Sequence, residues 1–142
     1  MNMKIRNFYF LIAGVLAMLF AFTHAWNGQS AVLPALDIRT ISMDTQTVFT
    51  YVWHIITVEN LVFGIAFIIM SFQRERSMTL FAAWMIAAIL IVRLMVILGV
   101  TAWIDAASLT DTLIDSIAIV IYVALIIGGT MKKKQSGGQQ LQ

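Results

Sequence analysis

Four long apolar runs, separated by short polar stretches, set the pattern of this chain. The runs cover residues 7–26, 45–73, 78–104 and 110–131. Each has about the 20 residues, or more, that a helix needs to cross a bilayer, and each is too long for a strand of a membrane barrel. The pattern therefore predicts an all-α protein whose residues 1–131 form a membrane-embedded four-helix bundle, running up-down-up-down.

The stretches outside the runs differ in character. Residues 27–44 form the one substantial loop and contain the only proline, Pro34. Their mixture of apolar and charged residues suits a connector lying on the outer membrane surface, or a lid over a site. Residues 132–142 are first basic and then rich in Gly and Gln, so we expect a disordered tail.

The first run has two interpretations. Thr23 and Ala25 stand in a small-x-small arrangement before Trp26, which is compatible with a cleaved signal peptide. The run is long for a signal and has bulky residues at its end. Small residues also recur on one helical face, which lets helices pack closely. We therefore expect the first helix to be retained. The face consists of Ala13, Gly14, Ala17, Ala21 and His24.

Composition agrees with a membrane class. Of the 142 residues, 61% are hydrophobic and 11% are charged, which is more apolar surface than a soluble core of this size can bury. The lipid bilayer is thus a partner, and nucleic acid is not expected to be one. The chain has no cysteine, which excludes disulfides, thiolate metal sites and quinone-linked disulfide oxidase chemistry.

The basic residues predict an orientation. Seven of the nine lie before the first run, between the second and third, or after the fourth, and the positive-inside rule then places both termini in the cytoplasm. Three tryptophans fall at the opposite interface. We expect an integral protein of a bacterial inner (plasma) membrane. The tryptophans are Trp26, Trp53 and Trp103.

Ionisable residues lie high in the predicted helices. Counting from the cytoplasmic ends at about 1.5 Å per residue, Glu59 lies about 20 Å up, Arg93 about 22 Å and Asp115 about 24 Å. The inner part of each helix is largely apolar. The arrangement predicts a polar pocket in the outer half of the bilayer, closed below, rather than a continuous pore.

Glu59 and Arg93 come to matching depth on neighbouring helices. Pairing would relieve the cost of placing each charge in hydrocarbon, so one interpretation is an intramembrane charge pair that locks the helices together. The other is functional, with Glu59 as a titrating carboxylate in a transport or proton-relay site and Arg93 tuning it or holding an anion. Both interpretations stay open at this stage.

The two histidines are the other candidate chemistry. His24, His54 and Asp115 lie on packing faces of three helices, and imidazole with carboxylate suits a divalent metal such as zinc, copper or iron. Haem ligation between the first two helices is the alternative function. In the structural interpretation, each histidine is simply hydrogen-bonded to a neighbouring helix. Further pocket residues are expected to be Asn60, Asp111, Thr50 and Thr57.

Two short motifs carry a resemblance. At HAWNG, residues 24–28, and WHIIT, residues 53–57, the chain resembles small four-helix bacterial membrane proteins of uncharacterised activity, with a His-x3-Gly ending helix one and a Trp-His-x2-Thr early in helix two. The resemblance implies a fold and no activity.

The sequence leaves several function classes. A binding or accessory subunit, in a homo-oligomer or larger membrane complex, is favoured. A small cation- or proton-coupled transporter acting as an oligomer is the alternative, and a metal- or haem-binding membrane protein is the third. Phosphate loops, Gly-x-Ser-x-Gly and His-Glu-x2-His are absent, so an enzyme is the least favoured.

Overall fold

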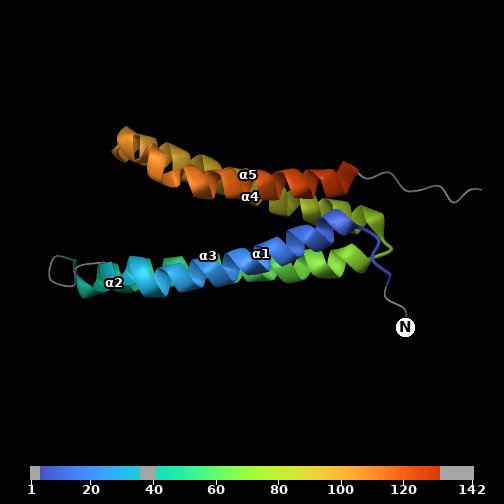
Figure 1. Ribbon diagram of the computed structural model, residues 1–142, viewed down its shortest axis with the longest axis horizontal. Coiled ribbons are helices and arrows are strands. Elements are labelled where there is room, and N and C mark those ends of the chain that lie inside the picture. Colours follow the sequence, from blue (N-terminus) through green and yellow to red (C-terminus); the bar gives the residue numbers. More distant parts are fainter. Residues whose placement is uncertain (1–3, 36–40, 132–142) are drawn as a thin grey trace, which may run out of the picture.

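The computed structural model describes residues 4–35 and 41–131, and these residues are helical with no strand. The all-α prediction is therefore confirmed for this part of the chain (Figure 1). The elements, in order, are α1 (Phe8–Asn27), the π-helical turn η1 (Gly28–Val32), α2 (Leu33–Ala35), α3 (Met43–Phe72), α4 (Arg76–Ile104), the 3₁₀ segment η2 (Ala106–Thr112) and α5 (Leu113–Met131).

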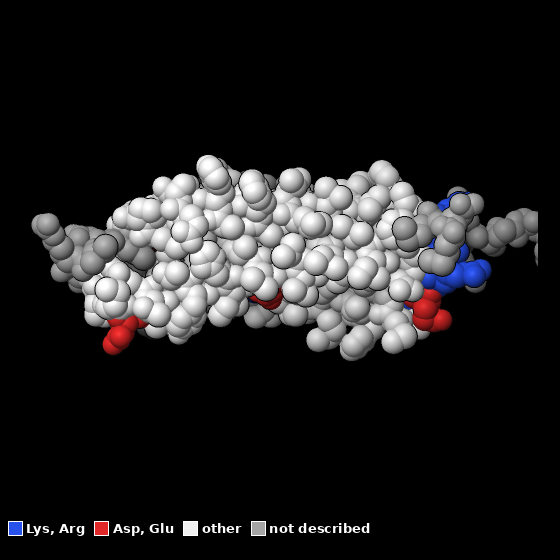
Figure 2. Space-filling model, turned by 90° about the horizontal axis from the view of Figure 1, so that it is seen from below, with Lys and Arg blue, Asp and Glu red and all other residues white. Residues whose placement is uncertain are grey.

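Four of the helical segments are long and apolar enough to cross a membrane. They are Phe8–Ala35, Met43–Phe72, Arg76–Ile104 and Ala106–Met131. Figure 2 shows that the middle of one face of the molecule is almost free of charged side chains, whereas lysine and arginine gather at one end. These features indicate an integral membrane protein.

The helix boundaries differ from the predicted ones at two places. The first span continues through η1 to Ala35, because Gly28 has the right-handed helical φ of −57° and ψ of −51° and does not end the helix. Pro34 lies in α2, among the last residues of this span. The fourth run opens with the 3₁₀ segment η2. Residues 36–40 of the predicted loop and the predicted tail, 132–142, lie outside the described residues.

The helices pack as two pairs. One pair is α1 with α3, which lie side by side over their length, and the other is α4 with α5. Between the pairs α1 contacts α5, whereas α3 and α4 touch at few positions. Figure 1 shows the pairs converging where the chain begins and diverging toward α2 and η2. We call these the closed end and the open end.

Glycine allows α1 and α3 to approach closely. A Cβ added to Gly14 would lie 2.9 Å from the backbone oxygen of Gly64, and one added to Gly64 would lie 3.0 Å from that of Gly14. No larger residue fits this crossing without moving the backbones apart. The small face predicted on the first helix thus faces α3, with Ala13, Ala17 and Ala21 buried along it.

Backbone groups hold the closed end together. Ser71 O accepts hydrogen bonds from the backbone N–H groups of Arg6, at 2.8 Å, and Asn7, at 3.1 Å. The Asn7 side chain donates from Nδ2 to Gly129 O at 2.8 Å. Arg76 Nη2 donates to Thr130 O at 3.1 Å. The bond from Asn7 to Gly129 therefore links the two helix pairs, and the other bonds join the helices within each pair.

Candidate functional site

An ion pair joins α3 to α4. Arg93 pairs with Glu59, and its Nη1 donates to Asn60 Oδ1 at 3.2 Å. The side chains of Arg93 and Glu59 are 17% and 32% exposed, and Asn60 is buried. The guanidinium thus has a carboxylate and an amide oxygen as acceptors, which compensates the cost of a charge in the bilayer.

A second contact joins the end of α1 to α3. The rings of His24 and Trp53 are stacked, with centroids 4.2 Å apart and planes 6° from parallel. Trp53 Nε1 also donates to the backbone oxygen of His24 at 2.9 Å. Gly28 makes room for the indole, since a Cβ there would lie 2.0 Å from Trp53 Nε1. His24 Nε2 is buried without a hydrogen-bond partner among the described residues.

His54 lies near His24 but has a different partner. The side-chain amide of Gln29 is hydrogen-bonded to the ring of His54, with Gln29 Nε2 and His54 Nε2 2.9 Å apart. Gln29 is in η1, so this contact exists because the first helix continues past Gly28. Ligation of haem through His54 Nε2 would require this contact to break.

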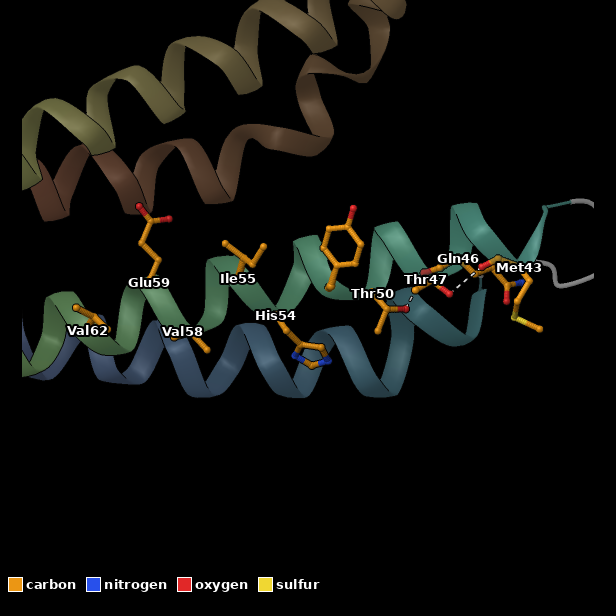
Figure 3. Close-up of a pocket in the computed structure, with 10 residues that line it drawn as sticks. Met43, Gln46, Thr47, Thr50, His54, Ile55, Val58, Glu59 and Val62 are labelled. Carbon is orange, nitrogen blue, oxygen red and sulfur yellow. Dashed lines mark hydrogen bonds between the residues drawn. The ribbon is translucent and has the colours of Figure 1, made fainter.

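An open groove of about 910 Å³ runs along one side of α3. Figure 3 shows its side chains, with the Glu59 carboxylate directed toward α4 and α5 and the His54 ring directed toward α1. All ten lining residues belong to α3, so no other described helix forms a wall. They are Met43, Gln46, Thr47, Thr50, Tyr51, His54, Ile55, Val58, Glu59 and Val62.

The threonines of the groove have their donors satisfied within α3. Thr47 Oγ1 donates to Met43 O at 2.9 Å, and Thr50 Oγ1 donates to Gln46 O at 2.8 Å (Figure 3). Such bonds to the preceding turn let a hydroxyl enter an apolar environment at low cost. The hydroxyl oxygens can still accept a further hydrogen bond from a neighbour.

The predicted aspartates lie at the open end. Asp111 in η2 and Asp115 in the first turn of α5 are both exposed. Asp115 and Arg93 are close enough for electrostatic interaction with His24. Yet residues 4–35 and 41–131 contain no group of three or more His, Asp or Glu side chains that could hold a metal ion. The metal set expected from the sequence, His24, His54 and Asp115, is therefore not assembled as a ligand group.

The predicted pocket residues are divided between two places. His54, Thr50 and Glu59 line the groove, and Asn60 lies beside the ion pair instead. Thr57 donates to Trp53 O at 3.4 Å and does not line the groove.

Sequence reasoning did not find Gln29, the stacking role of Trp53 or the space supplied by Gly28. The Asn-Gly step at residues 27–28 was interpreted as the end of a helix, and a loop has no register from which to predict a contact. The HAWNG and WHIIT motifs could have indicated this contact, because they lie side by side in the structure and His24 of the first stacks on Trp53 of the second.

Comparison of the chain with protein-family models, curated proteins and solved structures gives no match.

Proposed function

We propose that the chain is a small integral membrane protein that acts as a binding or accessory subunit, and that the α3 groove is its binding surface. The observation that carries this proposal is the position of Gln46, Thr50 and His54 in the groove of a membrane-spanning helix, where only α3 itself forms the lining. Thr50 and His54 already bond within the chain, to Gln46 O and to Gln29, but they remain in a groove that is open to the membrane on its other side. A partner helix seated in the groove would cover these polar groups and separate them from lipid.

A second copy of the chain is the partner that we propose. A two-fold axis places the groove of one copy opposite the groove of the other, so groups near the axis meet their own kind and the remaining groups meet in reciprocal pairs. Glutamine and threonine side chains both donate and accept hydrogen bonds, and can therefore pair with their own kind. The carboxylate at the end of the groove, Glu59, has its own counter-ion in Arg93, so a dimer would not oppose two uncompensated charges.

The proposed topology has four alternating crossings with both termini in the cytoplasm, in a bacterial inner membrane. Basic side chains at the closed end and the resemblance at residues 24–28 and 53–57 support it. Reporter fusions after residues 40, 75, 107 and 142 are expected to lie outside, inside, outside and inside. A cytoplasmic signal after residue 40 would invert the topology and contradict the proposal.

Cross-linking tests the dimer. The chain has no cysteine, so single cysteines can be introduced at Val58 in the groove and at Val92 on α4, which are 56% and 53% exposed. In native membranes Val58→Cys should form disulfide-linked dimers under mild oxidation, and Val92→Cys should not. A His54→Leu substitution in the Val58→Cys background should reduce the yield. Monomers from both, or dimers only from Val92→Cys, would overturn the proposal.

Transport of a proton or small cation is a second candidate. It is favoured by one observation, the partial exposure of Glu59 to the groove. Against it, Arg93 compensates the carboxylate, as a structural pair would. Proton-driven flux in liposomes, lost in Glu59→Gln and retained in Glu75→Gln, would establish transport and replace the accessory proposal.

A further inference from the structure

A basic pocket lies at the closed end, opposite to the open end with α2 and η2. Its volume is about 860 Å³, and four cationic side chains line it against a single carboxylate, that of Glu75. Figure 2 shows lysine and arginine gathered at this end of the molecule. The cationic residues are Lys4, Arg6, Arg74 and Arg76.

The walls of this pocket are held by long-range contacts. The segment that carries Lys4 and Arg6 is fixed to the end of α3 by the backbone hydrogen bonds to Ser71 O. Arg76 is fixed to the end of α5 by its bond to Thr130 O. The cationic groups are therefore brought together by the fold and do not rest on one flexible segment.

Two helices begin at the pocket. α1 starts at Phe8 and α4 at Arg76, and the positive ends of their dipoles add to the charge of the side chains. Glu75 at the N-cap of α4 makes no side-chain bond to the helix backbone, and its Oε1 accepts from Ser77 Oγ at 3.0 Å. The dipole ends favour an anion in the pocket, and the Glu75 carboxylate opposes one.

The pocket also has an apolar part and a defined depth. Phe10, Met70 and Leu80 line it together with the basic residues. Lys4 and Arg6 lie just before the first span, which begins at Phe8, and Arg74 lies just after the second, which ends at Phe72. This is the level of lipid headgroups. A ligand that fits has an anionic head and an apolar body.

We propose that this pocket binds the headgroup of an anionic phospholipid, with the start of its acyl chains against the apolar residues. The site does not depend on the proposed function of the α3 groove. A basic pocket between helices on the cytoplasmic side is suited to an anionic headgroup. A zwitterionic headgroup brings its own ammonium group to the same cationic rim, so it is bound less well.

Lipid titration of the purified full chain in detergent, followed by native mass spectrometry, tests the site. Phosphatidylglycerol should be retained at a concentration at least tenfold lower than phosphatidylcholine with the same acyl chains. Each exposed cation near a membrane surface changes anionic lipid binding by roughly fivefold. The double variant Lys4→Gln/Arg74→Gln should therefore lose roughly 25-fold, and Glu75→Gln should gain severalfold.

A charge-matched control separates a built pocket from diffuse attraction. Lys132→Gln/Lys133→Gln removes the same charge from the tail, and should lower phosphatidylglycerol binding severalfold less than the pocket variant does. Equal losses in the two double variants, or equal retention of the two lipids, would overturn the proposal. Competition by glycerol phosphate as strong as that by the lipid would assign a free phosphate instead. If the pocket variant fails to fold, as judged by its thermal transition, Glu75→Gln decides, since no gain contradicts the site.

Discussion

The indole of Trp53 lies flat on the imidazole of His24, with ring centroids 4.2 Å apart and planes 6° from parallel, and its Nε1 donates to the His24 backbone oxygen at 2.9 Å. One side chain therefore ties α3 both to a ring and to the backbone of α1. His24 lies in the last turns of α1, and the same span continues into η1, where Gln29 contacts His54.

Replacing Trp53 should loosen this attachment. Trp53→Leu removes an aromatic stacking contact and a hydrogen bond, which together stabilise a fold by about 2 kcal/mol. Trp53→Phe keeps a ring and loses the donor, so its effect on the free energy of unfolding should be about half as large. Chemical or thermal unfolding in detergent measures both. Loss of the ring-current shift of the His24 ring protons by NMR gives a readout independent of stability.

The matched control is Trp103→Leu, because Trp103 is 91% exposed. It should leave the unfolding free energy within about 0.5 kcal/mol of the parent. Gly28→Ala should resemble Trp53→Leu, since its Cβ would occupy the place of the indole. An unchanged His24 signal in both variants would contradict the stacking.

The crossing of α1 and α3 predicts opposite effects for one chemical change at two glycines. Gly14→Ala places a Cβ against the Gly64 backbone and should destabilise the chain by about 1–3 kcal/mol. Gly99→Ala meets nothing within 4 Å and should stabilise α4 by up to about 1 kcal/mol, because alanine is the better helix former. If both substitutions changed the free energy of unfolding in the same direction, the helices would not cross at Gly14.

The membrane helices were the predictable part of this fold. Each apolar run has the length of a bilayer crossing, so the number of helices follows from composition and length. Depth counting placed Glu59 and Arg93 at similar heights, and in the structure these side chains are in contact. The helical conformation of Gly28 was not predictable, because glycine is compatible with a helix end and with a helix interior alike.

The divergence of the two helix pairs also lay beyond sequence reasoning. Periodicity assigns faces to each helix but does not give the angle between pairs, which depends on packing at the closed end around Phe10, Phe67 and Tyr122. His24, His54 and Asp115 were expected to converge because of their similar depth and their positions on the packing faces of three helices. In the structure the outer end of α3 carries an open groove instead.

The turn between α4 and η2 should respond to acid. Asp105 accepts hydrogen bonds from Ser108 Oγ, at 2.7 Å, and from the Ala107 backbone N–H, at 3.0 Å, and these bonds lower the pKa of its carboxyl group. A lowered pKa means that the stabilisation is present above the ordinary aspartate value, about 3.9, and is lost as pH falls through the folded value. At neutral pH, Asp105→Ala should speed hydrogen exchange of the Ala107 amide.

Asp111→Ala in the same 3₁₀ segment is the control and should leave that amide unchanged. Acidification below the folded pKa of Asp105 should bring the parent protein to the exchange behaviour of Asp105→Ala. If the two proteins still differ at the lowest pH, the carboxylate is not the group responsible.

The pair of Glu59 and Arg93 should show strong coupling. Removing one partner leaves the other charge uncompensated, which costs about 3–5 kcal/mol for a fully buried pair. Because these side chains are 32% and 17% exposed, we expect the lower end, about 3 kcal/mol or less, for Glu59→Gln and for Arg93→Gln. The double variant Glu59→Gln/Arg93→Gln should lose less than the sum of the two single losses, with a coupling of at least about 1 kcal/mol.

Charge reversal of both residues, Glu59→Arg/Arg93→Glu, should recover more folded protein than either reversal alone. Asn60 Oδ1 would then lack its donor, which limits the recovery. Unfolding of the parent and the three glutamine variants in the same detergent measures the cycle, and additive losses would show that the two charges act separately.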